Sequence, residues 1–142
     1  MAGKDHLSTK EHLSQIGRYD KMIKNKLLEI EQLRTIVCGT TIPLKKDKIQ
    51  TTPNHDKLGD IVTKIVFLEG NLDEIIEKRH KIVEEIEAIP RQEHYDVLAK
   101  RYILGMGLTE IVLETGLSEK QVRRYINEAY DVFESMGKNV LK

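Results

Sequence analysis

Hydrophobic residues in the first two thirds of the chain recur at alternating spacings of three and four. One such seam covers residues 13–37 and is interrupted by Asp20 and Arg34, and a second covers residues 58–89 and is interrupted by Arg79. This alternation places one apolar side chain per turn on the same side of a helix. The pattern therefore predicts two long helices, the first of about 25 residues and ending at Gly39.

The two predicted helices are expected to pack against each other. A helix with a broad apolar face needs a partner, and the nearest one is the other helix, folded back as an antiparallel hairpin of coiled-coil type. We therefore predict a helical arm over residues 10–89, preceded by a flexible N-terminus, residues 1–9. The second helix carries apolar residues beside its seam as well, so we expect the arm to form a homodimer or to dock another protein.

The connection over residues 39–53 has no helical periodicity and contains Pro43 and Pro53. A loop of this length is often functional. Its lysines could contact nucleic acid or an acidic partner, although a solvated loop explains them more simply: Lys45, Lys46 and Lys48.

The C-terminal third has the pattern of three shorter helices. Pro90 ends the arm, residues 91–104 form the first helix, and Gly107 with Glu110 can cap the next, residues 108–115. We predict that this unit covers residues 90–137 and that residues 138–142 are a tail.

A helix, a tight turn and a helix follow one another over residues 107–127. Gly116 supplies the left-handed conformation that ends the first helix. Ser118, with Gln121 three residues later, has the form of a capping box at the start of helix 118–130. Polar side chains fall on the outer face of that helix and have the chemistry that contacts bases and phosphates in a major groove. The candidate DNA-binding residues are Ser118, Lys120, Gln121, Arg123, Arg124 and Asn127. An ordinary helical hairpin with a solvated face would have the same pattern.

The charge balance qualifies this hypothesis. The chain has 23 basic and 23 acidic residues, and residues 90–142 have 8 of each (0). Residues 1–53 have 10 basic and 6 acidic residues (+4), and residues 54–89 have 5 and 9 (−4), as expected for two helices that pack together. Because phosphate neutralisation supplies much of the affinity for DNA, a monomer is expected to bind weakly.

Catalytic, metal and cofactor chemistry find no support in the pattern. The five histidines are scattered, Cys38 has no ligand companions, and a phosphate-binding glycine loop is lacking. We expect no enzyme activity, no metal and no cofactor. The single cysteine and the lack of a signal peptide or a membrane-spanning apolar run predict a cytoplasmic protein.

The segments RYDKMIKNKLLEIEQLR, TPNHDKLGDIVTKI and LAKRYILGMGLTEIVLETGLSEKQVRRYINEAY resemble small phage regulators of the ArpU and RinA type, which activate late-gene transcription. The last segment is also similar to region four of bacterial sigma factors. The resemblance implies that the outer face of helix 118–130 contacts promoter DNA and that RNA polymerase is a possible partner.

The sequence thus predicts an all-α protein with a long antiparallel helical hairpin followed by a three-helix unit that contains a helix-turn-helix. The expected function is that of a phage transcription regulator, an activator of late genes in the bacterial host cell. It would read double-stranded promoter DNA with helix 118–130 and use the arm to form a dimer or to contact RNA polymerase or another phage or host protein. Two alternatives stay open. One is a small-terminase-like DNA-packaging subunit, and the other is an interaction adaptor whose helix-turn-helix does not bind DNA.

Overall fold

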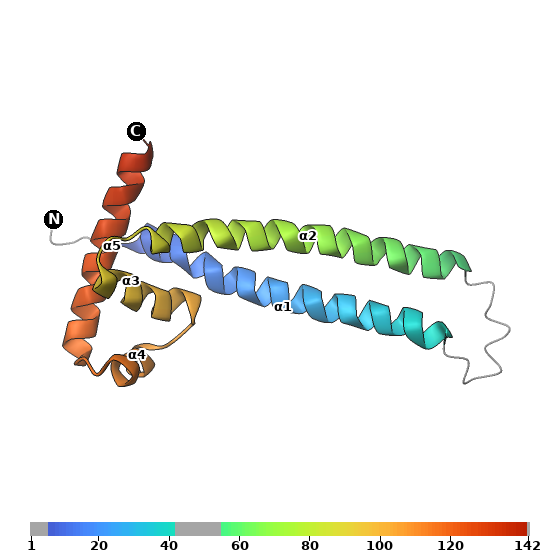
Figure 1. Ribbon diagram of the computed structural model, residues 1–142, viewed down its shortest axis with the longest axis horizontal. Coiled ribbons are helices and arrows are strands. Elements are labelled where there is room, and N and C mark those ends of the chain that lie inside the picture. Colours follow the sequence, from blue (N-terminus) through green and yellow to red (C-terminus); the bar gives the residue numbers. More distant parts are fainter. Residues whose placement is uncertain (1–5, 42–54, 142) are drawn as a thin grey trace. The chain divides into compact units, whose positions relative to one another are not determined.

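The computed structural model describes residues 6–41 and 55–141, with side chains for residues 6–39 and 57–137. Every regular element in these residues is helical, and they include no strand, so the protein is all-α as predicted. In chain order (Figure 1) the elements are α1 (Leu7–Thr41), α2 (His55–Glu87), α3 (Gln92–Leu98), the π-helical turn η2 (Ala99–Ile103), α4 (Leu108–Thr115) and α5 (Glu119–Leu141). The lysine-rich stretch with Lys45, Lys46 and Lys48 lies outside the described residues.

Helix α1 extends beyond both predicted ends. It includes residues 7–9, which the sequence assigned to a flexible N-terminus, and Thr9 is buried there. It also continues through Gly39 to Thr41. A glycine in a helix interior costs only about 1 kcal/mol relative to alanine. Gly39 alone is therefore a weak stop signal. For the same reason α5 passes Gly137 and includes residues 138–141 of the predicted tail.

The chain divides into two compact units, and the division falls within α1 and α2 rather than at residue 90. One unit, here the arm unit, is Asp20–Glu77. The other, here the head unit, combines Met1–Tyr19 with Lys78–Lys142. The first turns of α1 and the last turns of α2 thus belong with the C-terminal helices.

Within the arm unit, α1 and α2 lie side by side and run in opposite directions (Figure 1). Their contact is formed by buried Ile30, Ile65, Leu68 and Leu72. Arg34, a polar break in the predicted seam, lies at the surface and pairs with Glu69 of the other helix. An exposed pair of this kind contributes about 1 kcal/mol or less. The aliphatic contacts therefore supply most of the stability of this unit.

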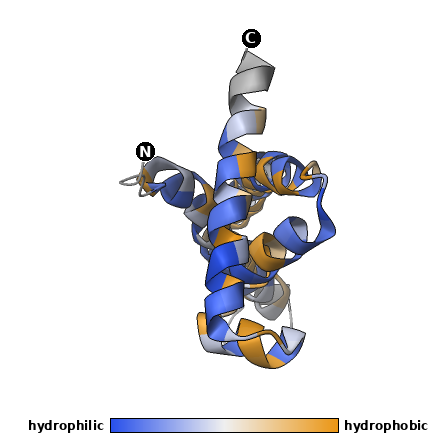
Figure 2. Ribbon diagram, turned by 90° about the vertical axis from the view of Figure 1, so that its left-hand side faces the viewer, coloured by the Kyte–Doolittle hydropathy of each residue, from blue (hydrophilic) through white to orange (hydrophobic). Residues whose placement is uncertain are grey.

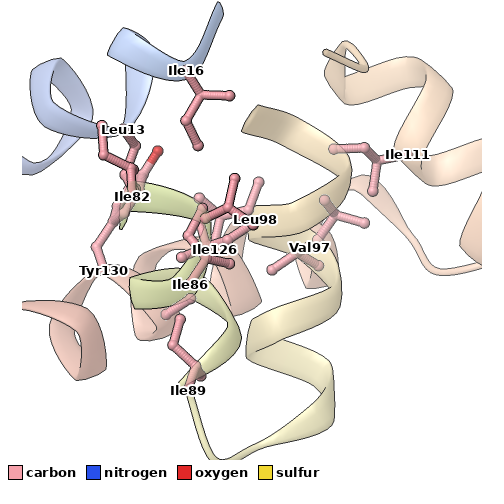
Figure 3. Close-up of a cluster of buried hydrophobic side chains, with 13 residues drawn as sticks. Leu13, Ile16, Ile82, Ile86, Ile89, Val97, Leu98, Ile111, Ile126 and Tyr130 are labelled. Atoms are coloured by element: carbon pink, nitrogen blue, oxygen red, sulfur yellow. The ribbon is translucent and has the colours of Figure 1, made fainter. Parts of the chain in front are cut away.

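The core of the head unit draws on every helix that enters it (Figure 3). Leu13 and Ile16 come from α1, and Ile86 from α2, and all three are 0% exposed. Val97 from α3 and Val122 from α5 pack into the same cluster. Fully burying an aliphatic side chain stabilises by roughly 1.5–3 kcal/mol. The C-terminal helices are therefore held in place by the first turns of α1 and the last turns of α2.

The predicted helix over residues 91–104 changes its geometry part of the way along. Helix α3 passes into η2 at Ala99, and the Leu104 amide donates to the Ala99 carbonyl, five residues earlier, at 2.9 Å. The wider turn is followed by Gly105, whose φ is 70°. Widened turns of this kind are often found at functional sites. This one carries Arg101 and Tyr102.

Candidate nucleic-acid interface

The turn between α4 and α5 is fixed by the local signals that the sequence carries. The Gly107 amide donates to the Glu110 carboxylate at 2.8 Å, which satisfies one unpaired donor at the start of α4. Gly116 has a φ of 77° and its amide donates to the Val112 carbonyl. The Gln121 amide donates to the Ser118 hydroxyl at 3.1 Å. These predictions of capping and turn are confirmed.

One part of the predicted capping box differs. The Gln121 side chain lies along α5, with its amide nitrogen 3.5 Å from the Tyr125 hydroxyl. The cap therefore consists of the Ser118 hydroxyl on the Gln121 backbone amide, and Gln121 is half-buried rather than fully exposed.

The two helices are packed firmly through their inner faces. Ile111 of α4 and Val122 and Ala129 of α5 are 0% exposed, and Ile126 is 9% exposed. Truncating a buried isoleucine to alanine costs about 2–5 kcal/mol, because a cavity remains. These buried residues of α5 form the inner face that the sequence predicted, and Tyr125 lies half-buried beside it.

The remaining predicted residues lie on the outside of α5. In Figure 2 α5 lies at the front, and most of its ribbon is coloured as hydrophilic. Lys120, Arg123, Arg124 and Asn127 are exposed, as is Ser118 at the cap. The predicted face is thus brought together on one helix, except for the partial burial of Gln121.

Acidic side chains accompany both arginines of this face. Arg123 donates to the Glu119 carboxylate from Nε at 3.1 Å and from Nη2 at 2.7 Å. Arg124 lies 3.6 Å from Glu128 and over the Tyr125 ring, 5.6 Å from its centroid. Exposed pairs one turn apart contribute only a few tenths of a kcal/mol, so a phosphate or a base edge can displace the carboxylates at little cost.

A pocket beside α5 contains residues that the sequence did not indicate. Lys10 of α1 and Arg101 and Tyr102 of η2 line it together with Arg123 and Asn127 of α5. Tyr130 completes the wall, and its hydroxyl lies 2.5 Å from that of Tyr102. Burial, reinforced by the hydrogen bond with Tyr102, raises the pKa of Tyr130 above its ordinary value. No sequence spacing relates Lys10 to Arg101, because only the packing of the head unit brings them together.

A second cluster that the sequence missed joins the start of α1 to α5. His6 Nδ1 lies 2.8 Å from Glu134, and His6 Nε2 lies 3.4 Å from Asp131. The Thr9 hydroxyl also donates to Glu134. One ligand atom from each of His6, Asp131 and Glu134 lies within 4.8 Å of the others, a spacing within reach of a divalent cation. In the structure, however, these groups bind one another, and the cluster attaches His6 and the first turn of α1 to α5.

A buried histidine attaches α3 to the same helix. His94 is 4% exposed, and its Nε2 lies 3.0 Å from a Glu128 carboxylate oxygen. Since a carboxylate only accepts, Nε2 carries the hydrogen of this bond. The other nitrogen, Nδ1, is buried and has no hydrogen-bond partner among the described residues. Glu128 is therefore shared between His94 and Arg124, and it links the outer face of α5 to the core.

Comparison with known proteins gives limited information. No family model matches the chain, and no solved structure does. Peptide chain release factor subunit 1 of Pyrococcus abyssi (strain GE5 / Orsay) is similar, at 26% identity over 140 residues. The match covers 87% of this chain and 32% of the release factor, so the chain spans about a third of that protein's length. A likeness of this extent does not assign the chain to a family.

None of the described helices is long and apolar enough to cross a membrane.

Proposed function

We propose that the protein is a DNA-binding transcription regulator of the phage late-gene type and that α5 reads the major groove of promoter DNA. The observation that carries the proposal is the grouping of Lys120, Arg123, Arg124 and Asn127 on the exposed side of one helix. The opposite side of that helix is anchored in the core through Val122 and its neighbours. A rigid helix with an exposed polar face is the element that helix-turn-helix proteins place in the groove.

The side chains of this face suit the chemistry of base edges. Arginine and lysine donate to guanine O6 and N7, and asparagine forms a two-bond contact with adenine. Each good contact of this kind contributes about 1–3 kcal/mol of discrimination against the wrong base. The Ser118 cap and Gly116 set where α5 begins, so they determine how far its first turns enter the groove.

The electrostatics favour a protein that does not act alone. Residues 90–142 have no net charge, and Glu119 and Glu128 accompany the arginines. The affinity of one head unit for DNA is therefore expected to be low. In this proposal the arm supplies the remainder, through a second copy of the chain or through RNA polymerase or another phage or host protein.

Exposed apolar side chains support this role for the arm. Val66 is 62% exposed and Phe67 is 63% exposed, and Leu27, Leu28 and Val62 are each about half exposed. Apolar groups in this number on one pair of helices are typical of an interaction surface. A small-terminase-like packaging subunit would use such a surface to form a ring of many copies, and mass measurement in solution distinguishes that alternative from a monomer or dimer. An adaptor without DNA-binding activity is the second alternative, and the zero net charge of residues 90–142 is what favours it.

The test is binding to a duplex that contains a phage late promoter, measured by fluorescence anisotropy. Arg123→Ala combined with Arg124→Ala removes two cations from the proposed reading face. Arg91→Ala is the matched control, because Arg91 is also exposed and also pairs with a carboxylate, that of Glu93, in the same unit. The double variant is expected to lose affinity and the control to retain it.

A further inference from the structure

The pocket beside α5 combines three cations with hydrogen-bond donors. Lys10, Arg101 and Arg123 come from three different elements, and the described residues that line the pocket include no aspartate or glutamate. Its volume is about 330 Å³, which is in the range of small ligand sites. The head unit is nearly neutral, with 14 basic and 13 acidic residues, and this wall is a local concentration of positive charge although Arg123 also pairs with Glu119. Such a wall attracts anions.

The neutral groups of the pocket also favour an acceptor-rich ligand. The Tyr102 and Tyr130 hydroxyls lie 2.5 Å apart, so one of them donates to the other. The proton of the accepting hydroxyl is not used in that bond and can be donated to a ligand. The Asn127 amide adds two more donors. A phosphate oxygen only accepts hydrogen bonds, so these groups are complementary to it.

The fold places Lys10, whose side chain is exposed, at the wall of this pocket. Its ammonium lies 5.9 Å from the centroid of the Tyr130 ring, a distance typical of a cation–π contact. Neighbouring Leu13 is fully buried in the head-unit core and fixes this turn of α1.

Two pocket residues connect it to the proposed reading face. Arg123 and Asn127 are four residues apart, so they lie one above the other on the same side of α5. We propose that the pocket receives a backbone phosphate of the duplex whose major groove α5 enters, held by Lys10, Arg101 and Arg123. This inference rests on the proposed function and extends it, since it makes the start of α1 part of the DNA interface. Arg123 then contacts the backbone, while Lys120 and Arg124 are left to contact bases.

The assignment has a measurable consequence for salt dependence. Each phosphate that a protein neutralises on B-form DNA contributes about 0.9 to the slope of log K against log salt concentration. Phosphate contacts carry no sequence information directly. Loss of the pocket cations should therefore weaken binding to specific and scrambled duplexes by the same factor.

The experiment compares Lys10→Ala combined with Arg101→Ala against Lys100→Ala. Binding to a late-promoter duplex and to a scrambled duplex is measured by fluorescence anisotropy at several salt concentrations. Lys100 is adjacent to Arg101, but its ammonium lies 3.0 Å from Asp96 and it lines a different pocket. The double variant is expected to bind about 10-fold or more weakly at low salt, with the slope reduced by about one unit. Lys100→Ala should behave like the wild type. Circular dichroism checks that both variants keep their helix content.

A second variant separates charge from packing. Lys10→Arg combined with Arg101→Lys keeps both charges and should retain the wild-type salt slope. If the alanine variant binds both duplexes like the wild type while Arg123→Ala with Arg124→Ala abolishes binding, the pocket assignment is overturned and the proposed function stands. If the wild-type protein binds no duplex at any salt concentration, the proposed function and the pocket assignment both fall.

Discussion

Replacing Leu13 by alanine tests whether the first turns of α1 are part of the head-unit core. Leu13 and Leu27 occupy the same hydrophobic seam, so the sequence pattern gives them equal importance. The structure separates them, because Leu13 is 0% exposed and Leu27 is 50% exposed. Leu13 packs in the cluster that holds Ile86, Val97 and Val122, and a cavity there has walls on several helices.

The expected magnitudes follow from this burial. A fully buried Leu→Ala substitution lowers the free energy of unfolding by about 2–5 kcal/mol. At Leu27 half of the side chain already contacts solvent, so its truncation should cost about 1 kcal/mol or less. Urea denaturation followed by circular dichroism measures both values, and the slope with denaturant checks that the unfolded states are comparable.

The comparison between the two variants decides the question. A larger loss for Leu13→Ala supports a head unit that depends on α1. Equal losses would refute this reasoning, because they would mean that the C-terminal helices fold independently of the first turns of α1.

Two further predictions concern the turn and the tyrosine pair. Gly116→Ala should lower the free energy of unfolding by about 1–2 kcal/mol, because its φ of 77° is unfavourable for a residue with a Cβ. Gly17→Ala is the control and should raise the free energy of unfolding by about 1 kcal/mol, since Gly17 is helical and a Cβ there meets open space. Effects of the same sign in the two variants would contradict the left-handed conformation of Gly116. Burial raises the pKa of Tyr130 above its ordinary 10.0, so in strong alkali the unfolded chain loses this proton before the folded chain does. The free energy of unfolding is therefore expected to fall as the pH rises above about 10, and urea titrations of Tyr130→Phe should show a smaller fall than those of the wild type. An identical fall in the two proteins would show that Tyr130 is not its cause.

Local sequence signals predicted the turn of the candidate site correctly. Gly116, Ser118 and Glu110 act on backbone groups within a few residues of themselves, so their effects can be read without knowledge of the fold. The seam of α2 was equally informative, and its apolar positions from Ile65 to Ile89 are buried. Capping and periodicity are properties of one helix, and this is why they could be predicted.

Contacts between distant segments could not be predicted in this way. His6 and Glu134 are separated by 128 residues, and neither has a local pattern that indicates the other. The exposure of Leu27 has the same origin, since a seam shows which side of a helix is apolar but not which turns find a partner. The π-helical turn at Ala99–Ile103 has no compositional signature, and it carries Arg101 into the pocket with Lys10.

The central claim is that α5 contacts DNA, and the most direct measurement is the affinity of Arg123→Ala with Arg124→Ala for late-promoter duplex, relative to Arg91→Ala. Each arginine contact with a base edge or a phosphate is expected to contribute about 1–3 kcal/mol. The double variant should therefore bind at least about 30-fold more weakly than the wild type, while Arg91→Ala stays within about twofold. Equal affinity of the double variant and the wild type would contradict the claim.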